Sequence, residues 1–550
     1  MSMFSIGLSG LNAAQNALNT TSNNISNVYT PSYNRELTQL GEGRVGGGVR
    51  VNDIERQFNT YVANQLNNAK TQSSALETYY SQVSQIDNLL ADRDAGLSPL
   101  MQTFFSSLED LASSPSDPAA RQGVLGTANT LSAQFRSFDG YLQDMQSNIN
   151  GQIRDEVVQI NNSIEQVATL NREISLARAR TGEAPNGLLN QRDFLVSELN
   201  ERLDIKLNVQ DGKTYNISLP NGQPLVTGAS SFKLEAIQSD YDPQRLVVGY
   251  RDSSNNVAQL DESTVKGGAL GGLMLFRSET LDKTQNQIGQ LAVSLSIAFN
   301  EQHKQGMDLD GLQGEDFFRV NPLQVTYQTE GAPAVEMNYV ADNIDQLRPT
   351  DYTIRFEGGE PSVTRRDSSE KVDIGSGWDA ANNTLVFGGI SMVFGSTPQN
   401  GDRFEIQPLR RAASGIDVDI NDLDKIAAGQ PLNPEDDPAD WIAAGAGDNR
   451  NALALQELQS RSIVGGNASV SGAYGVIVSD VGNRTNITQV NLDARQGLTD
   501  QLRAVQQSES GVSLDEEAAN LIRYQQFYQA NARVIDTAGT IMDTILNLRN

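Results

Sequence analysis

Hydrophobic residues repeat every seven positions at both ends of the chain. Near the N-terminus the repeat runs through Phe4, Leu11, Leu18 and Ile25, with Gly7, Ala14, Thr21 and Val28 between them. Near the C-terminus it runs through Leu514, Leu521, Tyr528, Ile535 and Met542, interleaved by Tyr524, Asn531, Ala538 and Ile545. Spacings of three and four place each set on one stripe of a helix, as in coiled coils. The two ends are therefore predicted to pair as helices.

The N-terminal helix has little with which to stabilise itself alone. Residues 1–34 carry no charged side chain and few large apolar ones. Ordering the backbone costs about 1–2 kcal/mol per residue, whereas burying one large apolar side chain returns about 1.5–3 kcal/mol. We predict that both ends are disordered in the isolated subunit and fold when subunits stack. Periodicity leaves open the alternative of a coiled coil that is already ordered within one chain.

Helical spacing also continues through the interior. The predicted helices cover about 54–90, 99–112, 119–180, 272–304 and 474–508. The dipeptide Asp117-Pro118 is typical of a helix start. Ile149, Ile153 and Val157 follow two consecutive steps of four, a stutter that locally unwinds a left-handed supercoil. These segments predict an elongated helical bundle assembled from distant parts of the chain.

Two interior stretches change to the alternating period of strands. The first begins at Ile205 and contains the turns Asp211-Gly212 and Asn221-Gly222, and the second covers about 317–408. Residues 29–48, which include Pro31 and the triplet Gly46–Gly48, are predicted to form a loop or flexible joint. Residues 416–448 are predicted to form a long irregular connection.

The predicted fold class is multidomain α+β, with paired terminal coiled-coil helices, an elongated α-helical bundle and two inserted mainly-β domains. We assign the terminal domain to 1–50 and 509–550, the helical bundle to 51–204, 265–315 and 411–508, the small β-domain to 205–264, and the second β-domain to 316–410.

Composition narrows the function classes. The 550 residues include 41 basic and 68 acidic side chains, a net charge of −27 that argues against nucleic acid and anionic membrane surfaces as partners. There is no cysteine and a single histidine, which removes disulfides, thiolate metal sites and nearly all Ser-His or Cys-His catalysis. The sequence contains no run of 18 apolar residues, so no membrane span is predicted. The N-terminus lacks the basic and apolar regions of a Sec-type signal peptide.

Candidate chemistry is sparse. Asp308, Asp310 and Gly311 slightly resemble the start of a calcium loop, but the glycine comes too early and a carboxylate is missing, so a surface turn is favoured. His303, near a predicted helix end, is expected to interact with the last carbonyls rather than act as a base. Trp378 and Trp441 are expected to be packing residues rather than sugar platforms. We therefore predict no catalytic site, no metal and no cofactor.

A short N-terminal motif carries a family resemblance. The segment SNNISNVYTPSYNRE, from Ser22 to Glu36, resembles the signature of bacterial flagellar axial proteins. The matching residues are Asn23, Asn24, Ile25, Asn27, Tyr33 and Arg35. The family often has a glycine before the tyrosine, where this chain has Ser32. Rod, hook and hook-associated proteins share this signature, so it indicates only the class.

The C-terminal stretch is more specific. GVSLDEEAANLIRYQQFYQANARVIDTAGTIMDTILNLR, from Gly511 to Arg549, is similar to the hook-associated protein 1 family, the junction proteins between hook and filament. Interior segments near Ser113, Leu188, Gly268 and Ala298 resemble that family in the same order. The resemblance covers nearly the whole chain, least clearly in 320–410. It implies a structural component that polymerises at the distal end of the hook, and no enzyme.

The resemblance also implies a route and a set of partners. Such proteins are exported unfolded through the flagellar type III apparatus without a cleaved signal, and they lie outside the cell. The implied partners are further copies of the chain, the hook protein, hook-associated protein 3 and a cytoplasmic export chaperone. The assembly residues are expected to be Phe4, Leu11, Leu18, Ile25, Leu514, Leu521, Tyr528, Ile535, Met542 and Ile545. The chaperone is expected to cover Tyr524, Phe527 and Tyr528 before export.

Two other interpretations stay open at this point. The first is the hook subunit itself, although the long helices predicted at 54–90, 119–180 and 272–304 argue against the β-rich middle of hook proteins. The second is a secreted enzyme or adhesin carried on an axial-protein frame. Its site would have to lie in 317–408, where no catalytic constellation is present.

Overall fold

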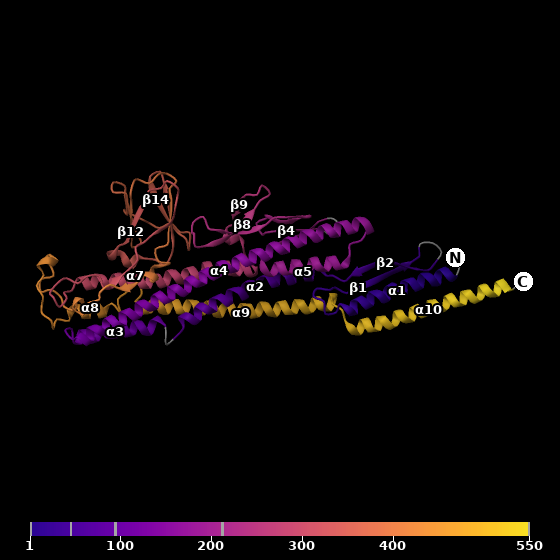
Figure 1. Ribbon diagram of the computed structural model, residues 1–550, viewed down its shortest axis with the longest axis horizontal. Coiled ribbons are helices and arrows are strands. Elements are labelled where there is room, and N and C mark those ends of the chain that lie inside the picture. Colours follow the sequence, from indigo (N-terminus) through magenta and orange to yellow (C-terminus); the bar gives the residue numbers. More distant parts are fainter. Residues whose placement is uncertain (1–2, 44–46, 93–95, 211–213, 548–550) are drawn as a thin grey trace.

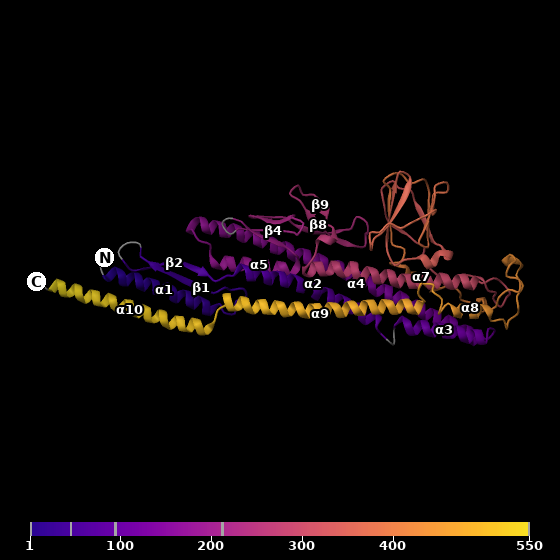
Figure 2. The same ribbon diagram turned by 180° about the vertical axis from the view of Figure 1, so that it is seen from behind.

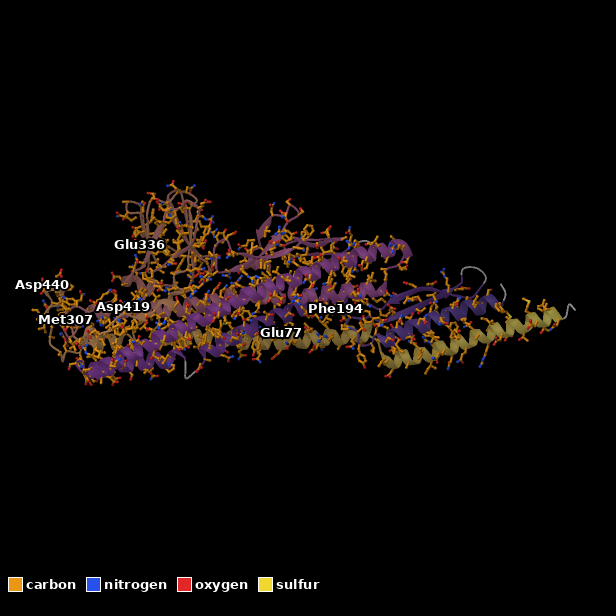
Figure 3. The ribbon with its side chains drawn as sticks, in the orientation of Figure 1. Glu77, Phe194, Met307, Glu336, Asp419 and Asp440 are labelled. Atoms are coloured by element: carbon orange, nitrogen blue, oxygen red, sulfur yellow. The ribbon has the colours of Figure 1, made fainter. Side chains whose placement is uncertain are left out.

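The two ends of the chain lie side by side at one tip of an elongated molecule (Figure 1). The computed structural model describes residues 3–43, 47–92, 96–210 and 214–547. Helix α1 (Met3–Ser26) packs along helix α10 (Leu514–Asn547). The same arrangement is seen from behind in Figure 2. Asp440 and Met307, labelled in Figure 3, lie at the opposite tip. The predicted pairing of the chain ends as helices is confirmed.

A rod of long helices forms the middle of the molecule. Its helices are α2 (Thr60–Leu90), α3 (Leu97–Ser113), α4 (Pro118–Thr181), α5 (Asn186–Arg202), α6 (Gly268–Phe276), α7 (Asp282–Lys304), α8 (Arg450–Glu457) and α9 (Val470–Ser510). The predicted start of the longest helix is confirmed, because the Asp117 side chain accepts a hydrogen bond from the Ala119 N–H at 3.0 Å and Pro118 begins the first turn. Helix α5 was not predicted.

The predicted helix over 272–304 is interrupted. It begins at Gly268, and between α6 and α7 one turn is a π-helix, Arg277–Leu281. A Cβ on Gly272 would lie 2.4 Å from the carbonyl oxygen of Ala75, so only glycine lets α6 approach α2 this closely. A π turn is a frequent site of function or strain in helices, and here it lies beside the ionic cluster described below.

Both inserted β regions stand on one side of the rod (Figure 1). The first holds a four-stranded sheet in the order β3-β4-β5-β6 and a three-stranded sheet, β7-β8-β9, and the second holds two four-stranded sheets, β11-β18-β13-β14 and β12-β17-β16-β15. The strands of the first region are β3 (Lys206–Gln210), β4 (Thr214–Ser218), β5 (Pro224–Thr227), β6 (Ser230–Ser231), β7 (Leu234–Gln238), β8 (Leu246–Arg251) and β9 (Val257–Gln259). Those of the second are β11 (Val325–Gln328), β12 (Val335–Tyr339), β13 (Tyr352–Glu357), β14 (Glu360–Arg365), β15 (Trp378–Asp379), β16 (Thr384–Phe387), β17 (Ile390–Phe394) and β18 (Arg403–Ile406).

The predicted fold class is confirmed, whereas the exact domain limits stay predictions. The turn at Gly222 is present, with a φ of 92°, and the predicted turn at 211–212 lies outside the described residues. The stretch 416–448 holds only the two-residue strand β19 (Asp417–Val418), which pairs with β10 (Phe318–Arg319), and short 3-10 turns. It is an irregular connection, as predicted.

The prediction of a loop over 29–48 holds for 29–35 and is wrong from Glu36 to Glu42. Strands β1 (Glu36–Glu42) and β2 (Val49–Arg56) form an antiparallel hairpin that packs on α1. The following helix begins at Thr60 rather than at 54, because the Asn59 side chain accepts from the N–H groups of Tyr61 and Val62. Only one face of this two-stranded sheet is covered, so apolar and polar residues alternate only weakly along its strands. The glycines in the segment are also typical of a loop. Gly46, the predicted flexible joint, lies outside the described residues.

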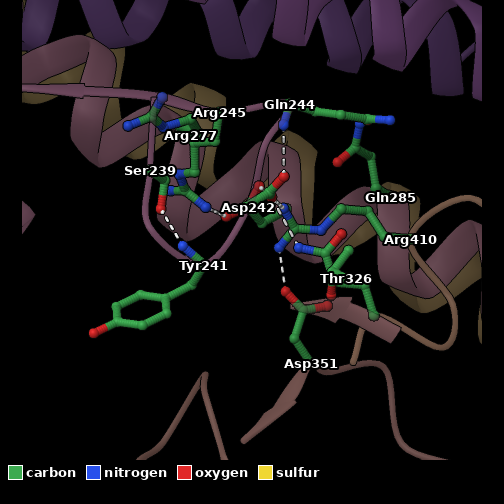
Figure 4. Close-up of polar contacts among 12 residues, drawn as sticks. Ser239, Tyr241, Asp242, Gln244, Arg245, Arg277, Gln285, Thr326, Asp351 and Arg410 are labelled. Atoms are coloured by element: carbon green, nitrogen blue, oxygen red, sulfur yellow. Dashed lines mark hydrogen bonds and ion pairs between the residues drawn. The ribbon is translucent and has the colours of Figure 1, made fainter. Parts of the chain in front are cut away.

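A buried ionic cluster connects both β regions to the rod (Figure 4). Its arginines are Arg245, Arg277 and Arg410, and its carboxylates are Asp242, Glu262, Asp282 and Asp351. Arg410 forms an ion pair with Asp351 of the second β region, with Asp282 of α7 at 3.3 Å and with Asp242 of the first β region at 3.4 Å. The Arg410 guanidinium is thus shared by three parts of the chain.

The arginines of this cluster stabilise the ionised form of its buried carboxylates. Burial alone would raise the pKa of Asp282, but Arg245, Arg410 and Arg277 together hold it below its usual value. Burial raises the pKa of Asp351 even though Arg410 opposes the shift. Charged groups this far from water are tolerated only when they are paired, so we expect the cluster to fix how the β regions are mounted on the rod.

His303 does not interact with the last carbonyls of its own helix, contrary to the sequence-based expectation. Its Nε2 accepts a hydrogen bond from the Ala427 N–H at 2.9 Å, so Nδ1 carries the proton and donates to the Glu315 carbonyl oxygen at 2.6 Å. The ring is fully buried and stacks on Phe299. The side chain therefore joins two loop segments at the base of α7 rather than capping the helix.

Stability should fall in mild acid because of this histidine. Burial lowers the pKa of His303 from 6.5 to about 4, so the folded chain keeps the ring neutral while the unfolded chain binds a proton. Its contribution is complete above pH 6.5 and is lost as the pH falls towards 4, a loss of about 3 kcal/mol. Urea unfolding at pH 7 and pH 4.5 measures it against His303→Gln, which does not titrate. An equal acid sensitivity in both proteins would contradict the assignment.

Candidate assembly interface

Small residues on α1 let the terminal helices approach closely. A Cβ on Gly10 would lie 2.0 Å from Oδ1 of Asn531, and a Cβ on Gly7 would lie 2.8 Å from Cγ1 of Ile535. The buried residues of α1 are Gly7, Gly10, Ala13, Ala14, Ala17, Thr20, Thr21 and Asn24. The side chain of Asn531, a residue of the C-terminal stripe, therefore lies directly over Gly10 and helps to determine how the two helices align.

Apart from Ile535, which lies against Gly7, most large residues of the predicted stripes are not fully buried. Phe4 is 50% exposed, and Leu11, Leu18 and Ile25 are half-buried. On α10 only Glu517 is buried among the described residues. Leu514, Met542 and Ile545 are exposed, and Leu521, Tyr524, Phe527, Tyr528 and Ile535 are half-buried. The structure thus brings together the small residues of α1 with part of α10, and leaves most of the large apolar residues without full cover in one chain.

The axial-protein signature organises the return of the chain after α1. The Asn24 side chain is buried, donates to the Glu36 carbonyl oxygen at 2.9 Å and accepts from the Glu36 N–H at 3.0 Å. The Tyr33 hydroxyl donates to the same Asn24 amide, and burial together with Glu36 raises its pKa well above the usual value. Asn27 closes the last turn by bonding to the Asn23 carbonyl oxygen. These residues hold β1 against α1.

Arg35 connects this return to the start of α10. Its Nε donates to Glu517 at 2.7 Å and its guanidinium also reaches Glu516 at 2.5 Å, while its backbone N–H donates to the Ser510 carbonyl oxygen. Glu517 is only 1% exposed, so this ion pair holds both ends of the chain together where α9 gives way to α10.

Sequence reasoning missed the residues that join the terminal unit to the rod. The buried Asn34 side chain donates to Asn190 Oδ1 at 2.7 Å, and Arg56 donates to the same oxygen at 3.0 Å. Arg56 also pairs with Asp193 of α5 at 2.5 Å, and Asp193 accepts from the Tyr215 hydroxyl. Asn34 lies inside the signature segment Ser22 to Glu36. Its position there was the one feature of the sequence that could have indicated its role.

The described residues hold no group of three His, Cys, Asp or Glu side chains able to bind a metal ion. Asp308 and Asp310 both pair with Lys425 at 3.1 Å, and Gly311 turns the chain with a φ of 77°. The turn follows α7, and the Asp308 side chain is buried in it rather than exposed as a surface turn would have it. Within the described part of the chain, no helix has the length and apolar character needed to cross a membrane.

Known proteins resemble this chain over its whole length. It is 40% identical to "Flagellar hook-associated protein 1" of Salmonella typhimurium strain LT2 and 41% identical to the Escherichia coli strain K12 protein of the same name, in both cases across the full length of both chains. The chain belongs to the flagellar hook-associated protein 1 family. The resemblance noted in the sequence is thereby confirmed.

Four family models match successive segments of this chain. Residues 83–318 match the helical domain of the flagellar hook-associated protein FlgK, and residues 326–408 match a D2-like domain of flagellar hook-associated protein 1. Residues 4–33 match the flagella basal body rod protein model, and residues 506–548 match the C-terminal model of the basal body rod FlgEFG proteins. The terminal helices thus match models shared with flagellar basal body rod proteins, whereas the helical rod matches a model specific to the hook-associated protein.

One solved structure shares the fold of this chain. It is the flagellar hook junction protein FlgK from Burkholderia pseudomallei, with a TM-score of 0.73 and 27% sequence identity. The match covers 82% of this chain and the whole of the solved one.

Proposed function

We propose that this protein forms the structural junction between hook and filament by polymerising through its terminal helices. The observation that carries the proposal is the half-exposed apolar surface of the α1–α10 pair, including Phe4, Met542 and Ile545, on helices whose small residues already pack together. Exposed apolar surface of this extent favours burial against another subunit. The membership of the hook-associated protein 1 family supports the same role.

The ordering of these helices would then accompany assembly. Among the described residues of α10 only Glu517 is fully buried, and its large apolar residues are at most half-buried. A helix with so little packing is marginal in water. We propose that residues 1–50 and 509–550 order fully when subunits stack, and that burial of the assembly residues drives the polymerisation.

The finer partners are also proposals. The protein would contact the hook protein on one side and hook-associated protein 3 on the other. A cytoplasmic chaperone would cover Tyr524, Phe527 and Tyr528 before type III export without a cleaved signal, because an apolar surface of this kind promotes premature association. The protein would act outside the cell as a building unit, without catalysis, cofactor, nucleic acid or membrane binding.

Deletion of the gene tests the junction role. Cells lacking the protein should show complete hooks without filaments in electron micrographs, and flagellin should appear in the medium on a blot. Absent hooks would instead indicate a hook or rod subunit. Normal filaments would contradict the structural role and favour a secreted accessory protein.

A further inference from the structure

In its C-terminal part, α9 has an exposed and largely apolar face that carries no charged side chain. Its large residues are Ile487, Val490, Leu498 and Val505, with exposed fractions between 39% and 61%. From residue 483 onward, steps of three and four give a stripe of eight positions, Asn483, Ile487, Val490, Ala494, Leu498, Gln501, Val505 and Ser508. This is the spacing of a coiled-coil contact surface, and the residues that α9 buries in its own chain lie on another face. We call these eight positions the α9 stripe.

The outward face of α1 has the same pattern. Phe4, Leu8, Leu11, Gln15, Leu18, Ser22 and Ile25 follow steps of four and three, and all are exposed or half-buried. We call them the α1 stripe. Gly7 and Gly10 face α10, whereas Thr20 and Asn24 bond to the β1–β2 hairpin. The α1 stripe is therefore left without complete cover in the described part of its own chain.

Charge favours contact between these two surfaces. The chain carries a net charge of −27, so two copies repel each other wherever carboxylates meet. Neither stripe contains a charged side chain, and residues 1–34 contain none at all. A second copy can therefore approach here without burying unpaired carboxylates, which is costly.

The geometry requires that the two stripes come from different copies. Helices α1 and α9 lie one after the other along the long axis, so they cannot pack side by side within one chain (Figures 1 and 2). From Phe4 to Ile25 the α1 stripe extends about 32 Å, and from Asn483 to Ser508 the α9 stripe extends about 38 Å, at 1.5 Å per residue. The α9 stripe is therefore long enough to cover the whole α1 stripe.

The direction of packing follows from the chain path. Helix α9 runs towards the terminal unit, whereas α1 runs from the tip back towards the rod (Figure 1). Copies that point the same way therefore bring the two helices together antiparallel. Antiparallel alignment of the repeats places Phe4 opposite Val505, Leu11 opposite Leu498 and Leu18 opposite Val490.

We propose that the α1 stripe of one copy packs antiparallel on the α9 stripe of a neighbouring copy shifted along the long axis. The inference rests on the self-assembly proposed above and identifies the surfaces that perform it. Two different surfaces meet, so the contact is heterologous, and it propagates into a ring or helical array rather than closing on two copies.

The absence of cysteine allows a direct test. Flagella are isolated from cells whose only copy of the gene carries Leu11→Cys and Leu498→Cys, oxidised mildly and analysed on a non-reducing blot. Bands at multiples of the chain mass are expected, at least tenfold stronger than with the matched control Leu11→Cys and Gln496→Cys. Gln496 is also exposed on α9 but lies off the stripe. A second pair, Phe4→Cys and Val505→Cys, should behave like the first.

The outcomes separate the inference from the function on which it rests. Absence of higher-mass bands from both stripe pairs, or equally strong bands from the Gln496 control, overturns the α1–α9 contact and leaves the junction role intact when the unmodified chain is found in the flagella. Absence of the unmodified chain from isolated flagella overturns the proposed function itself, and the contact with it.

Discussion

Gly10→Leu should abolish incorporation of the protein into flagella and reduce swimming to the level of the deletion strain. A Cβ at this position would lie 2.0 Å from Asn531 Oδ1, and the Asn531 amide is itself held by a 2.8 Å hydrogen bond to the Phe527 carbonyl oxygen. Overpacking of this kind costs about 1–3 kcal/mol where helices cannot separate. Here the easier response is for α1 to move away from α10, which removes the pair that we propose to assemble.

A matched control distinguishes loss of pairing from loss of folding. Gly126→Leu adds the same side chain to a glycine inside α4, where a Cβ would meet no described atom within 4 Å. Swimming and flagellar incorporation should be retained in that strain. The purified Gly10→Leu chain should keep the helical circular dichroism and melting temperature of its rod. Normal swimming with Gly10→Leu would contradict the close approach of α1 to α10.

Arg410→Ala should destabilise the second β region by about 3–5 kcal/mol, because it removes the shared partner of three buried carboxylates. Asp351, Asp282 and Asp242 would then face one another with only the remaining arginines to oppose their repulsion. Trp378 reports on this region through its ring contacts with Phe356 and Phe394 at 5.4 and 6.1 Å. Urea unfolding followed by its fluorescence, in a Trp441→Phe background, measures the change.

The comparison variant for this experiment is Arg319→Ala. Arg319 pairs with Asp417 at 3.5 Å on the surface, where its side chain is 62% exposed. Removal of such a pair costs about 0–1 kcal/mol. Equal shifts of the unfolding midpoint in the two variants would mean that burial of the cluster does not determine its contribution.

Periodicity predicted the long helices well because each buries a continuous apolar stripe. Residues Ile149, Ile153 and Val157 are all buried in α4, as their spacing requires. The π turn at Arg277–Leu281 escaped notice because it changes the hydrogen-bond pattern without changing the composition. The β1–β2 hairpin escaped because a two-stranded sheet with one exposed face has no clear alternation.

The terminal stripes show a second limit of pattern reasoning. Periodicity identified Phe4, Leu11, Leu18 and Ile25, and grouped them with Gly7 and the other small residues between them. The structure separates the two sets, because glycine and alanine allow the backbones to approach while the large side chains turn outward. Hydrophobicity alone cannot reveal which of two interleaved series faces which partner.

The joining of the two chain ends acts as a check on completeness. The partners of Gly7 and Gly10 are Asn531 and Ile535, which are synthesised only after nearly all of the remaining chain. A product shortened by proteolysis or by premature termination before residue 531 lacks these partners and leaves Gly7 and Gly10 without their contacts to α10. Under the proposed assembly, such fragments would join the polymer poorly, because they cannot form the α1–α10 pair.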